Sequence, residues 1–297
     1  MPQARHALIA AVALAAALPA VADENVFGYL RGAETLPKGA LEAYQWFTQR
    51  SDKGAGHYTA LDSKTELEYG VSDRFQVSGE FNMMSIDTSG LLIDGYLPGD
   101  KKFGLRPQGL EFGMKYNFLS AAKDDVGLSA TAAFETAWID PHSGQDKREY
   151  EFETQLQAQK YFMEGQLVVL GNLGLRAAYE KRSPIADLPP DFDWPTDPEM
   201  EINLKLGGGV TYRFAPGWYI GGEFVRESEY ETEVGLERWS TFAGPTLHWA
   251  GEKWWGTFTW FQQIKGGGEM YAGQVDTDLH LIEKTKKEVR LKIGYNF

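Results

Sequence analysis

The chain has no cysteine among its 297 residues, which excludes disulfides, thiol nucleophiles and cysteine-ligated zinc. After residue 22 it also has no run of 18 apolar residues, the length that a membrane-spanning helix needs. Basic residues are in deficit, since 29 Lys and Arg stand against 42 Asp and Glu. No glycine-rich phosphate loop or basic aromatic patch is present, so we expect no nucleic-acid partner.

The first 22 residues have the organisation of a signal peptide. Arg5 and His6 precede an apolar run from Ala7 to Leu18, and small residues at Ala20 and Ala22 form a cleavage motif. Such a segment directs export from the cytoplasm. We expect cleavage near Ala22, which leaves a protein that is periplasmic, secreted or embedded in an outer membrane.

An alternation of apolar and polar residues decides among these locations. Residues 75–83 place Phe, Val, Gly, Phe and Met on one face and Gln, Ser, Glu and Asn on the other. Residues 110–118, 150–158 and 202–214 repeat this pattern. A period of two is that of a β-strand, and one apolar face with one polar face is typical of a barrel wall between lipid and lumen.

Twelve segments carry this pattern, and short and long connections alternate between them. The sequence predicts a closed antiparallel transmembrane β-barrel (all-β) of about 12 strands in residues 40–297, with short periplasmic turns and longer extracellular loops. Residues 23–39 precede the barrel, and we expect this N-terminal segment either to cover the periplasmic mouth or to enter the lumen as a plug. The segments are 40–50, 57–71, 74–84, 108–119, 125–138, 146–162, 165–181, 200–214, 217–230, 235–250, 253–265 and 286–297.

Aromatic residues bunch beside the short connections, which predicts a girdle at the membrane interface. Its predicted members include Tyr116, Phe118, Trp254 and Trp255. The last strand ends on an aromatic residue, and its alternation resembles the terminal signature that the outer-membrane assembly machinery recognises in its clients. The residues of this assembly signal are Val289, Leu291, Ile293, Tyr295 and Phe297.

Residues 25–39 and 51–58 are similar to an uncharacterised proteobacterial family of presumed outer-membrane barrels. The resemblance extends over the whole mature chain. It implies a barrel fold and an outer-membrane location, and it brings no catalytic or binding residue.

Polar residues at alternate strand positions are the candidates to face the lumen. Two interpretations stay open, because opposite charges can pair into a filled polar core or can line a narrow aqueous path with an acidic bias. The candidates are Glu66, Glu68, Glu80, Glu111, Lys115, Glu135, Glu151, Glu153, Arg176, Lys205, Arg213, Glu223, Arg290 and Lys292.

Three other groups of residues could carry chemistry. His142 beside Ser143 suggests a lipid hydrolase only weakly, since no triad partner is evident. Acidic residues between 191 and 201 lack the spacing of a calcium loop, so we expect a solvated loop and no metal site. Lys147, Arg148 and the lysines at 284, 286 and 287 lie near predicted outer strand ends, where lipopolysaccharide phosphates would be within reach.

These observations predict a passive channel or transporter for small solutes in the outer membrane of a Gram-negative cell. The alternative is a structural or surface-interaction barrel with a filled lumen, and an outer-membrane lipid hydrolase is the weaker third hypothesis. We expect no enzyme activity, no catalytic residue and no cofactor. The expected partners are outer-membrane lipid, lipopolysaccharide, the assembly machinery and a small solute.

Overall fold

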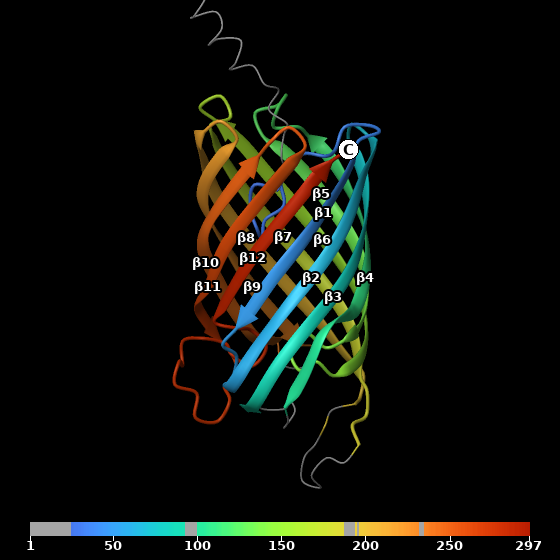
Figure 1. The fold of residues 1–297 in the computed structure, drawn as a ribbon, viewed down its shortest axis with the longest axis vertical. Helices are drawn as coiled ribbons and strands as arrows, with labels where there is room; N and C mark the ends of the chain where they lie inside the picture. Colours follow the sequence, from blue (N-terminus) through green and yellow to red (C-terminus); the bar gives the residue numbers. More distant parts are fainter. Residues whose placement is uncertain (1–24, 93–99, 187–193, 195, 232–234) are drawn as a thin grey trace, which may run out of the picture.

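Twelve antiparallel strands close into a barrel in the computed structural model (Figure 1). The structure describes residues 25–92, 100–186, 194, 196–231 and 235–297, so the predicted signal peptide and loop residues 187–193 lie outside the described residues. The barrel confirms the predicted fold class and strand number. The strands are β1 (Leu41–Ser51), β2 (Ala55–Ser72), β3 (Phe75–Leu92), β4 (Lys101–Leu119), β5 (Gly127–Ile139), β6 (Asp146–Phe162), β7 (Leu167–Arg182), β8 (Glu199–Ala215), β9 (Trp218–Glu231), β10 (Gly235–Ala250), β11 (Trp254–Gly267) and β12 (Lys287–Asn296).

The first and last strands close the sheet. β1 pairs with β12 along its length, from Glu42 opposite Asn296 to Ser51 opposite Lys287, and it also pairs with β2. An open sheet edge would leave backbone N–H and C=O groups without partners in hydrocarbon, at a cost of several kcal/mol for each group. Closure removes that edge.

The two faces of the wall differ as the alternation predicts. On β4, Leu110, Phe112 and Met114 point outward and are about half exposed, while Lys115 and Asn117 are buried on the inner face. Apolar side chains cover the outside of most strands in the same way. A water-soluble protein rarely exposes so large an apolar surface, so the outer wall is built to contact lipid.

The connections at the two ends of the barrel differ in length. Short turns lie at the upper end in Figure 1, and the long β7–β8 and β11–β12 loops lie at the lower end; we call these the short-turn end and the long-loop end. Gly217 closes one short turn with a φ of 71°, and a Cβ there would lie 2.4 Å from the Ala250 carbonyl oxygen. Among the described residues there is no helix of the length and hydropathy required to cross a membrane.

The prediction of a long loop over residues 84–107 is wrong. β3 continues to Leu92 and β4 begins at Lys101. In this part of the wall the polarity of the alternation is inverted, because Met84 and Ile86 point inward while Ser85 and Asp87 point outward. The inward side chains pack under the long-loop end instead of facing lipid, so the outward-apolar pattern does not detect these strand ends.

Trp255 also lies elsewhere than predicted. Its indole is inside the barrel with 2% of the residue exposed, and it packs beside Tyr44 while its Nε1–H donates to Glu42. Trp254, the next residue, points outward as a girdle residue should. Two adjacent tryptophans cannot both face lipid in a strand.

Candidate functional site

The barrel interior holds all fourteen polar residues that the sequence analysis selected. Each occupies an inward position of its strand, between neighbours that point outward. Glu66, Glu80 and Lys292 are deeply buried, whereas Arg176 and Lys205 keep about a third of their side chains exposed. The candidate site is therefore the interior as a whole.

Residues 25–36, which we call the plug, run inside the barrel toward its short-turn end (Figure 1). The wall residue Glu223 holds the plug by its backbone. One carboxylate oxygen accepts the N–H of Gly28 at 2.8 Å, and the other accepts those of Tyr29 and Leu30 at 2.9 and 3.2 Å. The hydroxyl of Thr259 donates to the first oxygen at 2.8 Å. A carboxylate with four donors in a buried setting is a strong anchor.

Other wall side chains bind the rest of the plug backbone. Asn172 accepts the Arg31 N–H and donates to the Arg31 carbonyl, at 2.8 and 2.9 Å. Gln159 accepts the Ala33 N–H at 2.8 Å, and Asn117 donates to the Ala33 carbonyl at 2.7 Å. The plug thus satisfies its backbone through wall side chains where a strand would use a neighbouring strand.

An apolar cluster completes the contact. Phe27 and Leu30 of the plug are fully buried and pack with Leu170, Val225 and Phe261 of the wall. The ring of Tyr29 stacks on Phe261 with centroids 4.1 Å apart. Each fully buried large apolar side chain contributes about 1.5–3 kcal/mol, so this cluster stabilises the docked plug substantially.

Five glutamates lie directly opposite one another on five neighbouring strands. We call Glu66, Glu80, Glu111, Glu135 and Glu151 the glutamate row; each is the register partner of the next, from β2 to β6. Like charges directly opposite in a sheet are destabilising, so such a row needs compensation. Lys64 pairs with Glu80 at 2.7 Å, Arg176 with Glu151 at 3.1 Å, and plug residue Arg31 with Glu111 at 3.9 Å.

The β11–β12 loop and the β5–β6 loop fold inward at the long-loop end. Ile282 packs with Tyr58, Met84, Ile86 and Ile139, which come from three different strands. His280 lies beside this contact; its backbone N–H donates to Gln263, and burial lowers its pKa to about 4. The interior is thus occupied near both ends.

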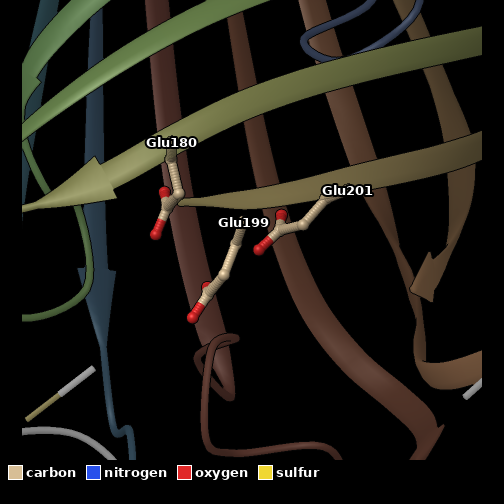
Figure 2. Close-up of side chains that lie close together, drawn as sticks. All are labelled: Glu180, Glu199 and Glu201. Carbon is tan, nitrogen blue, oxygen red and sulfur yellow. The ribbon is translucent and has the colours of Figure 1, made fainter. Parts of the chain in front are cut away.

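Three carboxylates approach one another close to the β7–β8 loop (Figure 2). Single oxygens of Glu180, Glu199 and Glu201 lie within 4.8 Å of each other. Two of the predicted loop acids thus join a third from β7, while Asp191 and Asp193 lie outside the described residues. Arg182 contacts both Glu180 and Glu199 at 2.8 Å, and Lys147 contacts Glu180 at 2.8 Å. These cations already compensate the cluster.

Lys147 and Lys284 are not placed to meet lipopolysaccharide. Both occupy inward positions, and Lys284 pairs with Glu227 at 2.5 Å. Arg148, next to Lys147, is exposed, and Lys287 pairs with Asp52 near the surface. Because successive side chains of a strand point to opposite faces, the position of each basic residue along its strand decides whether it faces outward.

His142 and Ser143 build a turn and do not form a nucleophile–base pair in the described part of the chain. The carboxylate of Asp140 accepts both of their backbone N–H groups, at 2.8 and 2.6 Å, and the Ser143 hydroxyl at 2.9 Å. Burial lowers the pKa of His142, with nearby Lys53 and Arg50 acting in the same direction. The hydroxyl is therefore engaged in loop structure.

Two small cavities lie between these elements. One, of about 20 Å³, is lined by Arg31 of the plug and by Trp46, Lys115 and Lys292 of the wall. The other, of about 50 Å³, is lined by Glu153, Arg176, Lys205 and Glu227. Both are bordered by charged side chains, and each has room for one to a few water molecules.

Sequence reasoning missed the wall amides that bind the plug, among them Gln76, Asn117, Gln159 and Asn172. They occupy inward positions, but a neutral amide there has no distinguishing pattern. Each contact joins segments that are 40 to 141 residues apart in sequence. The sequence indicates only that these amides lie at alternate strand positions, on the inward face.

A closed antiparallel wall, an apolar outer surface and a polar interior together define a β-barrel of the outer-membrane type. The chain belongs to the Family of unknown function (DUF6662), whose model matches residues 19–297. No curated protein matches it.

Solved structures share the fold. The chain is similar to the COG4313 outer membrane channel from Pseudomonas putida F1, with 15% identity and a TM-score of 0.57 over 89% of this chain and 98% of that one. It is also similar to the β domain of the Bordetella autotransporter BrkA, with 12% identity and a TM-score of 0.55 over 88% of this chain and 100% of that one. At these identities the likeness establishes the fold.

Proposed function

We propose that the protein is an outer-membrane channel for small polar solutes, closed at its short-turn end by the plug. The apolar outer wall and the barrel closure support the outer-membrane location. In that orientation the short turns face the periplasm and the long loops face the exterior, as in other bacterial barrels. The predicted signal peptide, with cleavage near Ala22, would deliver the chain to the periplasm.

The observation that carries this proposal is the way the plug is held. It forms no strand, and its backbone hydrogen bonds are made to wall side chains such as Glu223 and Asn172. Rotation of those side chains would release the plug without breaking the barrel ladder. A segment with separable contacts is the kind of element that opens and closes a path.

A reversible crosslink between plug and wall tests this gate. A Cβ built at Gly127 would lie 3.2 Å from the Cβ of Ala33, close to the 3.5–4.5 Å typical of a disulfide. It would also lie 2.9 Å from the Cβ of Ala121, so that turn must shift slightly. The chain has no cysteine of its own, so the A33C/G127C pair would form a single bond.

Conductance of the A33C/G127C protein in planar bilayers is the readout. We expect no openings when the bond is oxidised and discrete openings after reduction, with the wild type unaffected by the reductant. Equal conductance in both redox states would contradict plug gating. The single mutant A33C controls for the substitution itself.

The second candidate is a structural or surface-interaction barrel with a permanently filled lumen. The full burial of Phe27 and Leu30 favours it, because a deeply packed cluster opposes release. Silence of the reduced and the wild-type proteins at every voltage would support this alternative. We infer no enzymatic role, because Ser143 and His142 serve the β5–β6 turn. The assembly machinery would recognise the last strand, and lipopolysaccharide would surround the outer half of the wall.

A further inference from the structure

Two carboxylates at the start of the glutamate row face each other without a hydrogen-bond donor between them. Glu66 on β2 and Glu80 on β3 are register partners on the inner face, with 1% and 4% of their surfaces exposed. Among the described residues, neither oxygen of Glu66 accepts a hydrogen bond, and the same holds for Oε2 of Glu80. Two buried anions in contact are unstable unless something positive lies between them.

Arg31 lies near enough for its charge to act on Glu66, but its direct ion pair is with Glu111, and the other neighbouring donors are directed elsewhere. Lys64 donates to the other oxygen of Glu80 at 2.7 Å, and the Tyr44 hydroxyl donates to Glu68 at 3.0 Å. The side-chain amide of Asn82, 1% exposed, donates from Nδ2 to Glu135 at 3.0 Å, and its Oδ1 has no donor among the described residues. Four oxygens from three buried side chains therefore lack a hydrogen-bond donor in the same part of the wall.

The charge of the row points the same way. Three of the five carboxylates make a direct ion pair, each with one cation, namely Lys64, Arg31 or Arg176. With all five carboxylates ionised, the row keeps an excess of two negative charges, which one divalent ion would neutralise. Carboxylate and amide oxygens are the ligands that Ca²⁺ prefers, with water completing its six to eight positions.

We propose that Glu66, Glu80 and Asn82 form a binding site for a divalent metal cation of the Ca²⁺ type on the inner wall of the barrel. The site is independent of the proposed conduction, since a filled structural barrel would need the same charge compensation. The carboxylate triad of Figure 2 carries no such proposal, because Arg182 and Lys147 already lie against it.

Terbium luminescence tests the site, because Tb³⁺ replaces Ca²⁺ and is sensitised by nearby indoles. Trp46 is suitably placed, with the Lys64 ammonium 5.8 Å from its ring and 2.7 Å from Glu80. The protein would be refolded into detergent free of lipopolysaccharide, which itself binds divalent ions. We expect saturable, Ca²⁺-competed luminescence on excitation of tryptophan.

Matched Glu→Gln variants then locate the site. E66Q and E80Q should weaken Tb³⁺ and Ca²⁺ binding at least tenfold, while E201Q, in the triad, and E153Q, elsewhere on the inner wall, should stay within twofold of the wild type. Added Ca²⁺ should raise the Tm of the wild type and leave that of E66Q unchanged. Heat-modifiable migration in SDS gels confirms that each variant forms a barrel.

Three results would overturn the proposal. The first is the absence of saturable binding to the folded wild type, in which case the two carboxyls share a proton. The second is unchanged affinity in both E66Q and E80Q. The third is loss of binding in E201Q alone, which would place the ion in the triad.

Discussion

Replacing Glu223 with glutamine should release the plug while leaving the barrel intact. In the wild type, one carboxylate oxygen accepts the N–H groups of Tyr29 and Leu30. In E223Q an amide NH₂ group takes the place of one carboxylate oxygen. The two hydrogen bonds that this oxygen accepted are lost, and the NH₂ group faces the N–H or O–H groups that donated them. Hydrogen bonds to charged groups contribute about 1.5–3 kcal/mol each. If each bond is taken at the lower value, loss of two such bonds makes plug docking less favourable by about 3 kcal/mol.

That loss corresponds to a roughly 150-fold increase in the undocked population. Trypsin reports it directly, because the bond after Arg31 lies in the docked plug, where the backbone N–H and carbonyl of Arg31 bind Asn172. Lys38 lies outside the barrel and is exposed, so initial cleavage after Lys38 provides an internal reference. When opening is fast relative to cleavage, the rate follows the undocked population.

Mass spectrometry of the initial fragments separates the two cuts. We expect cleavage after Arg31 to accelerate about 100-fold in E223Q, with cleavage after Lys38 unchanged. E201Q, on the inner wall near the β7–β8 loop, should behave as the wild type. Equal rates after Arg31 in E223Q and E201Q, with both barrels heat-modifiable, would refute the idea that Glu223 anchors the plug.

Four further predictions concern other parts of the barrel. Burial lowers the pKa of His280 to about 4, so the undocked β11–β12 loop binds more protons than the docked loop between pH 6.5 and pH 4. Docking of this loop therefore weakens as the pH falls through that window. A spin label at Val275, which is 87% exposed, should become more mobile in the same window, and the change should be smaller in H280Q. I282A should cost about 2–5 kcal/mol locally and expose the β11–β12 loop to protease, against an unchanged barrel Tm. Deletion of Phe297 should lower the amount of assembled barrel in cells but not the stability of refolded protein. Reversal potentials should indicate cation selectivity in a plug-released channel, and anion selectivity would contradict an acidic path.

Strand number and strand identity were predictable because the membrane imposes one rule on the whole wall. Residues 202–214 show this most clearly, with outward Ile202, Leu204 and Leu206 alternating with inward Asn203 and Lys205. The rule fails at the long-loop end, where the strands extend beyond the apolar outer surface. There Met84 and Ile86 turn inward to pack with Ile282, and the sequence pattern is inverted.

The glutamate row was not predictable, although every member was selected as a lumen residue. Alignment of the row depends on register, and register depends on irregularities in the ladders. A register shift between Gly70 and Ser72 is what brings Glu66 opposite Glu80, and another between Asn117 and Leu119 precedes the contact of Glu111 with Glu135. Such bulges insert one residue without a clear mark in the sequence.

Arg31 connects the two proposals. Its backbone is held by Asn172 as part of the plug, and its guanidinium lies 3.9 Å from Glu111 in the glutamate row. Undocking the plug therefore removes one of the three cations that compensate the row and makes the wall a stronger cation site. By linkage, a divalent ion bound at Glu66 and Glu80 must weaken plug docking by the same factor by which the docked plug weakens ion binding. Under the two proposals together, a channel closed by an arginine-bearing plug over an acidic wall would be opened in part by the cations that it admits.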